Sequence, residues 1–192
     1  MSRTKLACVM LALCLGLVAA AVYEANREVV VEHSEISISP ATGDRVFQGE
    51  PFTGLVVSYY PDGTMAKAEQ FLDGRRHGYI KHWFEDGVLG FEATYQMGRR
   101  EGLATSWWSN GNKRSETSYV DDKVQGVSWR WYITGEKFKR FNYVAGKPEG
   151  LQQAWRSNGK LYSNFEYKNG RVYGLKKANL CFGLEDEEIL LN

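Results

Sequence analysis

Hydrophobic and polar positions alternate in short runs over most of the chain, and this alternation repeats every 24 residues between about residues 50 and 183. Runs such as 102–108 and 113–120 are rich in Val, Tyr, Trp and Thr at period two, which predicts strands of about seven residues. No helical periodicity competes with this pattern. Two aromatic columns recur at fixed places in each copy: Tyr59, Trp83, Trp107, Trp131 and Trp155, and Phe71, Tyr95, Tyr119, Tyr143 and Tyr167. The pattern therefore predicts one β-hairpin copied end to end.

Glycines and turn residues fix how each predicted hairpin closes. Six glycines stand 24 residues apart, and each is followed nine residues later by another. The first set is Gly54, Gly78, Gly102, Gly126, Gly150 and Gly174, and the second is Gly63, Gly87, Gly111, Gly135, Gly159 and Gly183. Sequences such as Pro61-Asp62-Gly63 and Ser109-Asn110-Gly111 separate the apolar runs and are typical of hairpin turns.

Two registers are open for these hairpins. A two-residue loop would pair Tyr60 with Met65 and place the two aromatic columns on opposite faces. A three-residue loop, with Gly63 in the left-handed region, pairs Tyr60 with Thr64 and Tyr59 with Met65. We favour the second register, which gathers both columns on one face. That face then carries Leu55, Val57, Tyr59, Met65, Glu69 and Phe71.

Short links such as 73–78 join successive hairpins, so neighbouring hairpins must lie side by side. The predicted fold class is all-β: an elongated, twisted antiparallel meander of tandem 24-residue hairpins. Four regions follow from the sequence. They are a signal peptide or membrane anchor at 1–21, an N-terminal extension with one or two strands at 22–49, the repeat array at 50–183, and an acidic and apolar tail at 184–192.

The first 21 residues have the parts of an export signal. Arg3 and Lys5 precede an apolar stretch at 6–18, and three alanines follow at 19–21. A retained single membrane anchor is an alternative, and Cys14 allows a lipoprotein as a third. We expect an exported protein, periplasmic or anchored facing the periplasm. After removal of the first 21 residues only Cys181 would remain, so the fold must hold without an internal disulfide.

Charge and motifs argue against several classes of function. The chain has 24 basic and 23 acidic residues, a net charge of +1, and so lacks the field expected of a nucleic-acid-binding protein. His33, His77 and His82 have no metal-ligand spacing, and no nucleophile or phosphate-binding motif is present. The sequence predicts a non-enzymatic protein without cofactor or metal.

The repeat unit resembles the MORN repeat, and specifically its bacterial variant form. The segments GLATSWWSNG and GLQQAWRSNG carry the variant's Gly-Leu-x3-Trp-x3-Gly pattern. The standard unit has a further glycine two residues after the first, where this chain has Val56, Ile80, Ala104, Ser128 and Gln152. Bacterial proteins with this variant are commonly grouped as YwqK-type antitoxins. The resemblance thus implies a binding role, with neutralisation of a toxin as one form of it.

Three surfaces are candidates for function. The two aromatic columns are interpreted as the structural core of the repeats, with a groove for an extended ligand as the alternative. On the opposite face the sequence predicts an apolar stripe, which is covered either by the chain (28–39 or 184–191) or by a protein partner such as an envelope protein or a toxin. The stripe consists of Val56, Tyr60, Ile80, Phe84, Trp108 and Tyr132.

A row of basic residues recurs in the links between hairpins. Its members are Arg75, Arg99, Lys123, Lys147 and Arg171. The row is interpreted as a solvated set of turn residues, with contact to anionic lipid as the alternative. The function predicted from the sequence is a β-repeat module of the cell envelope that binds or scaffolds a protein partner. The alternatives are a toxin-neutralising antitoxin and a peripheral membrane protein.

Overall fold

The computed structural model describes residues 28–175 of the 192-residue chain. The chain divides into two units, Met1–Val30 and Val31–Asn192, and the following description concerns the second. The predicted signal or anchor at 1–21, Cys181 and the tail at 184–192 lie outside the described residues. Within residues 28–175, no helix is both long and apolar enough to span a membrane.

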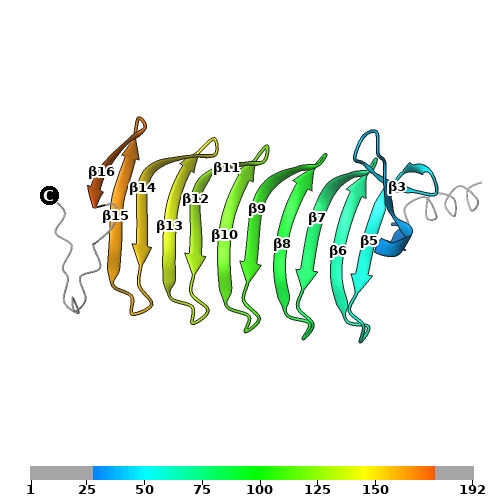
Figure 1. Ribbon diagram of the computed structural model, residues 1–192, viewed down its shortest axis with the longest axis horizontal. Coiled ribbons are helices and arrows are strands. Elements are labelled where there is room, and N and C mark those ends of the chain that lie inside the picture. The colour runs from blue at the N-terminus through cyan, green and yellow to red at the C-terminus, as the bar shows by residue number, and fades with distance from the viewer. Residues whose placement is uncertain (1–27, 176–192) are drawn as a thin grey trace, which may run out of the picture. The chain divides into compact units, whose positions relative to one another are not determined.

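Between residues 54 and 175 the strands are antiparallel and lie side by side in chain order (Figure 1). Within 28–175 there are a 13-stranded sheet, ordered β1-β5-β6-β7-β8-β9-β10-β12-β13-β14-β15-β16 with β11 beside β10, and a small sheet β2-β3-β4. The elements are β1 (Val30–Glu32), η1 (His33–Glu35), β2 (Ser37–Ile38), β3 (Arg45–Phe47), β4 (Glu50–Pro51), β5 (Gly54–Tyr59), β6 (Met65–Leu72), β7 (Arg75–Trp83), β8 (Leu89–Gln96), β9 (Arg99–Trp107), β10 (Lys113–Val120), β11 (Lys123–Val124), β12 (Gly126–Trp131), β13 (Lys137–Val144), β14 (Lys147–Trp155), β15 (Leu161–Lys168) and β16 (Arg171–Leu175). The predicted meander of tandem hairpins is confirmed.

Each hairpin closes through the predicted three-residue loop. The Tyr60 backbone N–H donates to the Thr64 carbonyl over 2.8 Å, and Tyr59 lies opposite Met65. Gly63 has φ 88° and its N–H donates to the Tyr60 carbonyl over 2.9 Å. The Thr64 backbone N–H donates to Asp62 and lowers the pKa of that carboxyl. The closing bond recurs from Phe84 to Val88, Trp108 to Asn112, Tyr132 to Glu136 and Arg156 to Lys160.

A β-bulge just inside each loop overturns the predicted arrangement of faces. Tyr59 lies opposite Met65, but Ser58 lies opposite Lys67, so Ala66 is an extra residue in β6. Because side chains alternate with period two, one extra residue moves the rest of β6 to the other face. Phe71 therefore pairs with Gly54 and Glu69 with Val56, on the face opposite Tyr59. The prediction that both aromatic columns share one face is wrong.

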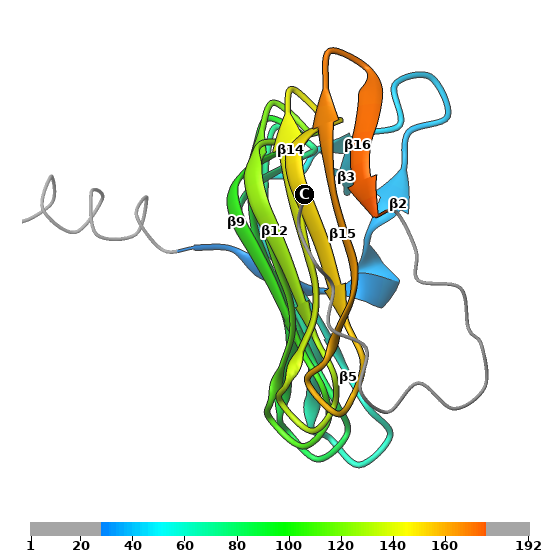
Figure 2. The same cartoon turned by 90° about the vertical axis from the view of Figure 1, so that its left-hand side faces the viewer.

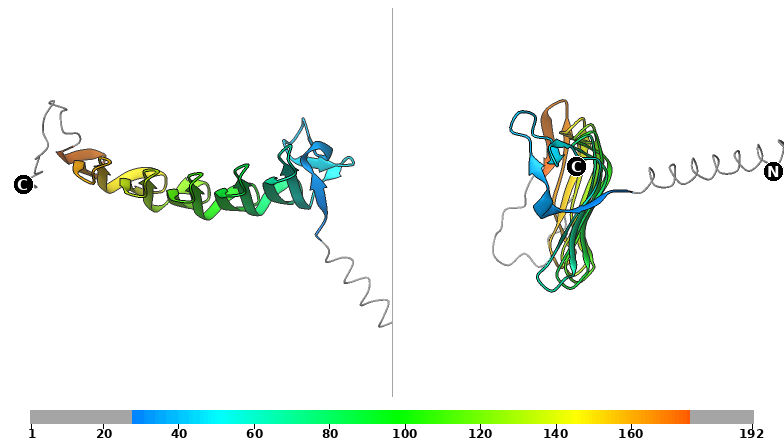
Figure 3. Two further views of the ribbon diagram at one scale, coloured as in Figure 1. Left: turned by 90° about the horizontal axis from the view of Figure 1, so that it is seen from below. Right: turned by 90° about the vertical axis from the view of Figure 1, so that its right-hand side faces the viewer.

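The links are two-residue turns in which both residues have positive φ. Asp73 and Gly74 have φ 48° and 76°, and Leu72 pairs directly with Arg75. This geometry is the type I′ turn, which matches the twist of the strands that it joins. Asp122, which replaces a link glycine, has φ 63°. The hairpins consequently follow one another in a single row (Figure 3).

The sheet has two unlike faces. The tryptophan face carries Leu55, Val57 and the column Tyr59, Trp83, Trp107, Trp131 and Trp155. The capped face carries Val56, Ile80 and the column Phe71, Tyr95, Tyr119, Tyr143 and Tyr167. This assignment follows from the residues that lie opposite one another in the ladder.

The N-terminal extension covers the capped face at the first hairpin. Val31, Phe52, Val56 and Phe71 form a buried apolar cluster, against which Ile36 and Phe47 pack. The Phe52 ring lies 5.9 Å from that of Phe47 and 6.5 Å from that of Phe71. Figure 2 shows η1 and β2–β3 on one side of the sheet. Residues 28–49 contain three short strands, where the sequence indicated one or two.

Candidate functional site

The two predicted core columns differ in burial and in neighbours. On the capped face Phe71 is 5% exposed, and arginines lie over the next two rings: Arg76 is 5.7 Å from the Tyr95 centroid and Arg100 is 4.2 Å from the Tyr119 centroid. On the tryptophan face Tyr59 is 48% exposed, whereas the four tryptophans of its column are half-buried. Each column therefore lines its own face; the columns differ in burial at their first members, Phe71 and Tyr59, whereas the other members of both columns are half-buried.

The stripe predicted as a partner surface is largely occupied by contacts within the sheet. Val56 and Ile80 are 3% and 2% exposed, and Phe84 packs against Gly90, where a Cβ would lie 3.0 Å from the ring. Tyr60 Oη donates to the Trp83 carbonyl over 2.7 Å, and Tyr132 Oη donates to the Trp155 carbonyl over 2.8 Å.

Trp108 Nε1 likewise donates to the Trp131 carbonyl over 3.3 Å. These side chains join each hairpin to the next at the loop end of the sheet. Burial, with the Tyr162 hydroxyl as a second cause, raises the pKa of Tyr132. For Val56 the N-terminal extension supplies the cover, which was one of the two alternatives that the sequence left open.

The basic row divides into a paired part and an unpaired part. Arg75 Nε lies 3.3 Å from Asp44, and Arg99 forms an ion pair with Asp121. Within residues 28–175, Lys123, Lys147 and Arg171 have no carboxylate partner. The three members of the row nearer the C-terminus therefore present unneutralised charge to a ligand.

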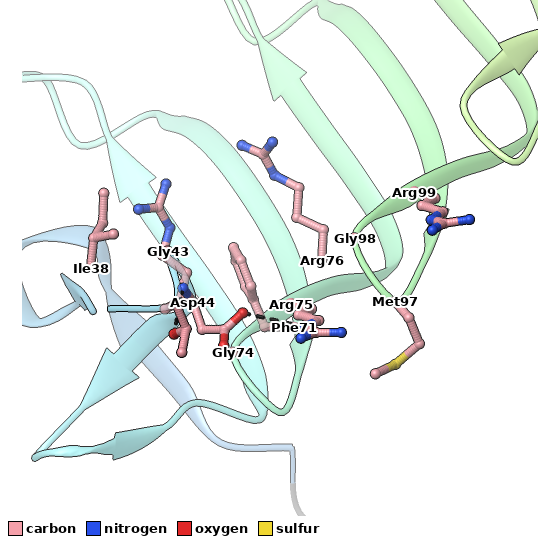
Figure 4. Close-up of a pocket in the computed structure, with 12 residues that line it drawn as sticks. Ile38, Gly43, Asp44, Phe71, Gly74, Arg75, Arg76, Met97, Gly98 and Arg99 are labelled. Atoms are coloured by element: carbon pink, nitrogen blue, oxygen red, sulfur yellow. Dashed lines mark hydrogen bonds and ion pairs between the residues drawn. The ribbon is translucent and has the colours of Figure 1, made fainter. Parts of the chain in front are cut away.

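A pocket of about 540 Å³ lies where β2–β3 meet the links of the first repeats (Figure 4). Arg45, Arg75, Arg76 and Arg99 line it together with Phe71. Three of these guanidinium groups already face carboxylates: Arg75 faces Asp44, Arg76 faces Glu69, and Arg99 faces Asp121. Within residues 28–175 no cluster of His, Cys, Asp or Glu could hold a metal ion. Because three of its four guanidinium groups are already paired with carboxylates, the pocket offers little net positive charge to an anionic substrate.

An apolar band runs across the tryptophan face. It was not predicted as a surface from the sequence. It consists of Leu103, Val120, Val127, Val144 and Leu151, one from each of β9, β10, β12, β13 and β14. Their exposed fractions are 49%, 52%, 37%, 53% and 37%. The five residues directly follow three repeat glycines, Gly102, Gly126 and Gly150, and two tyrosines of the second column, Tyr119 and Tyr143. They were not grouped from the sequence because the bulge, which brings Val120 and Val144 to the face of Leu103, was not predicted.

A tryptophan patch lies on the same face, nearer the loops. It consists of Trp129, Trp131, Trp155, Lys137 and Arg140. The Trp129 ring stacks at 6.0 Å on both Trp131 and Trp155, with interplanar angles of 22° and 21°. Lys137 Nζ is 5.5 Å from the Trp129 centroid and 5.9 Å from that of Trp155, and the Arg140 guanidinium is 5.8 Å from Trp129. The cations thus lie within range of cation–π attraction.

Charge is distributed unevenly along the array, although the whole chain is nearly neutral. Residues 28–98 contain eleven acidic and five basic side chains, whereas residues 123–171 contain three acidic and ten basic ones. Within the described residues, most of these later cations lack a carboxylate partner: Lys123, Arg130, Lys137, Lys139, Arg140, Lys147, Lys168 and Arg171. The near-neutral total therefore conceals a strongly basic region in the last hairpins.

Two hairpins match a known repeat family. Residues 100–121, which cover β10 and all but the first residue of β9, and residues 148–169, which cover β15 and all but the first residue of β14, match the MORN repeat variant. The match covers 44 residues of the chain. The hairpins on either side of residues 100–121 have the same closing hydrogen bond and the same bulge as the two matched hairpins. MORN repeats are generally non-catalytic modules for interaction with proteins or membranes. No curated protein matches the chain.

Proposed function

We propose that this protein is an exported, non-enzymatic module whose MORN repeats bind another protein of the cell envelope through the tryptophan face. The observation that carries this proposal is the apolar band, which keeps five large aliphatic side chains in water on five strands of one face. Contiguous exposed apolar surface on a folded protein is typical of an interaction site. No second layer of the described residues covers the band.

The spacing of the band suits an extended partner. Adjacent strands lie about 4.8 Å apart, so five strands present apolar side chains over about 20 Å. The tryptophan patch adds flat aromatic surface beside the band, and large aromatic side chains contribute strongly at protein interfaces. A partner with an apolar strip and acidic flanks would satisfy both parts of the face.

Two threonine substitutions test the proposed interface. We expect V120T/V144T to lose most of the capture of its envelope partner by crosslinking in intact cells, because two apolar contacts are replaced by hydroxyls. Threonine keeps the branched Cβ that favours strands, so folding should change little. The matched control is I38T/I133T, whose side chains are 57% and 49% exposed but lie outside the band. Equal capture by both variants would refute the interface.

Export is a part of the proposal that rests on residues 1–21, with their basic start, apolar stretch and terminal alanines. Cell fractionation combined with N-terminal sequencing tests it. A periplasmic protein that begins near residue 22 supports a cleaved signal, and an intact N-terminus in the membrane fraction supports an anchor. A toxin, as in YwqK-type antitoxins, is an alternative partner, and a toxin gene beside this one would favour it.

Contact with anionic lipid is a second candidate, favoured by the unpaired end of the basic row. Lys147 and Arg171 lack carboxylate partners within residues 28–175, whereas Arg75 and Arg99 are paired. If the row meets a membrane, K147Q/R171Q should weaken flotation with anionic vesicles several-fold more than R75Q/R99Q. Removal of two unscreened charges near a charged surface costs about 1 kcal/mol each. Equal weakening, or no flotation of the unmodified protein, would refute lipid contact.

A further inference from the structure

The tryptophan patch contains more cationic charge than its surroundings neutralise. Trp129 stands at the position that Val57, Lys81, Thr105 and Gln153 occupy in the other hairpins. Lys137 and Arg140 both approach its ring, at 5.5 and 5.8 Å. Neither has a carboxylate partner within the described residues, and Arg140 Nη1 is buried without a hydrogen-bond acceptor. Two like charges beside one ring, one of them with an unsatisfied N–H, indicate a missing anionic neighbour.

We propose that the acidic and apolar segment of this chain at residues 185–191 occupies the tryptophan patch. Its sequence, Glu-Asp-Glu-Glu-Ile-Leu-Leu, supplies four consecutive carboxylates and then three aliphatic side chains. The carboxylates complement Lys137 and Arg140, and the aliphatic side chains complement the stacked tryptophan rings. A carboxylate also accepts the N–H that Arg140 leaves without a partner.

The path of the chain brings this segment within reach of the patch. β16 ends the described residues at Leu175, which lies opposite Asn164. Asn164 lies opposite Gln153, Gln153 opposite Arg140, and Arg140 opposite Trp129. The described chain therefore ends in the same row of the sheet as Arg140 and Trp129.

The distance to be covered is short compared with the intervening chain. Arg140 is three strands from β16, which corresponds to about 15 Å across the sheet. The nine residues at 176–184 can span up to about 30 Å when extended. The connection therefore allows the acidic segment to reach the patch without strain in the chain.

The proposal goes beyond the proposed function and does not depend on it, because it concerns a contact within one chain. It has a consequence for that function, since the patch adjoins the apolar band on the same face. An acidic partner that binds the whole tryptophan face would have to displace residues 185–191 from the patch. Local concentration favours the tethered segment over a free one, so displacement requires additional contacts such as those of the band.

Zero-length carbodiimide crosslinking of the dilute full-length protein tests the proposal directly. The reaction joins a lysine ammonium to a carboxylate only when the two are in contact. We expect mass spectrometry of the monomer to show Lys137 joined to residues 185–188 at least five-fold more often than Lys147, which lies in the link row. Equal yields for the two lysines would overturn the proposal. Crosslinks found only between two chains would overturn it also, because the occupant would then be a second copy.

Tryptophan fluorescence provides a readout that does not require a covalent product. Neutralisation of the segment by E185Q/D186N/E187Q/E188Q and neutralisation of the patch by K137Q/R140Q should each shift the emission to longer wavelength. If the two groups meet, the combined variant shifts no further than either alone, because the same contact is lost. Shifts that add in the combined variant would show that the two groups act independently and would overturn the proposal. The variant K147Q/R171Q, which removes the same charge elsewhere, should leave the emission unchanged.

Discussion

At the scale of single residues, Glu69 on the capped face is a buried carboxyl group with two basic neighbours. Its residue is 7% exposed and it lies opposite Val56 in the ladder. Arg76 Nη2 is 3.4 Å from Glu69 Oε1, an ion pair at the long end of the range, and His82 Nε2 is 3.8 Å from the same oxygen. His82, together with Arg76, lowers the pKa of Glu69 below its ordinary value of 4.5, in opposition to burial, which raises it.

This lowered pKa predicts a specific pH dependence of stability. The folded state favours the carboxylate, so Glu69 contributes stability above pH 4.5, and that contribution is lost as pH falls through its lower folded pKa. We expect E69Q to lower the free energy of unfolding by about 1 kcal/mol at pH 7. The difference from the unmodified protein should shrink towards pH 3. Thermal unfolding from pH 3 to pH 7 measures it, and a difference that stays constant over that range would contradict the assignment.

At the scale of the hairpin, the repeat glycines have two separate reasons to recur. Gly63 and its equivalents close the loops with positive φ, whereas Gly78, inside β7, and Gly126, at the start of β12, have φ 88° and 79° within the strands. At Gly78 an added Cβ would lie 2.2 Å from Gln70 Oε1, and that oxygen accepts the Tyr79 N–H over 3.0 Å. At Gly126 nothing lies within 4 Å of the added Cβ. The two positions therefore share a backbone conformation but differ in crowding.

The comparison predicts unequal effects of one substitution. G126A should cost about 1 kcal/mol, the penalty for a side chain at positive φ. G78A should cost about 2 kcal/mol, because it also displaces the Gln70 amide from Tyr79 N–H. Urea unfolding of both variants measures the difference. In a Q70A background the two alanine substitutions should have equal cost, and a persistent gap there would mean that crowding by Gln70 is not its cause.

Within the hairpin, the sequence predicted the loop correctly but placed the second aromatic column on the wrong face. Asp62-Gly63 and the aromatic columns were sufficient to predict the loop and the Tyr59–Met65 pair, because turn chemistry is local. The bulge at Ala66 carries no distinctive residue, and its equivalents are Gly90, Arg114, Phe138 and Tyr162. One unmarked extra residue reversed the face of Phe71. The bulge also brings Val120 and Val144 to the face of Leu103, so the apolar band was not predicted as one surface. For the stripe, the sequence left open cover by the chain or by a partner, and Tyr60 and Tyr132 instead donate to backbone carbonyls of the next hairpin.

At the scale of the whole array, the hairpins are chemically unlike although their backbones repeat. The buried cluster of Val31, Phe52, Val56 and Phe71 lies at the first hairpin, and two arginines of the next strand, β7, are paired with carboxylates. The later hairpins bury small or polar side chains instead, such as Ala104, Ala154 and Gln152, and carry the unpaired cations. We therefore expect the stabilising contacts to be concentrated near β5–β7, whereas exposed apolar and basic surface is concentrated near β9–β14. This division suits a module in which one end fixes the fold and the other binds.

Native-state hydrogen exchange should reveal this division, because repeat arrays are stabilised mainly by contacts between neighbours. We expect backbone amides of β5–β7 to exchange at least ten-fold more slowly than those of β13–β15. F71A removes a ring from the buried cluster and should cost about 3–5 kcal/mol at that end. In F71A the protection of β5–β7 should fall to that of β13–β15, while β13–β15 change little. A uniform loss along the whole array would show instead that the hairpins unfold as one cooperative unit.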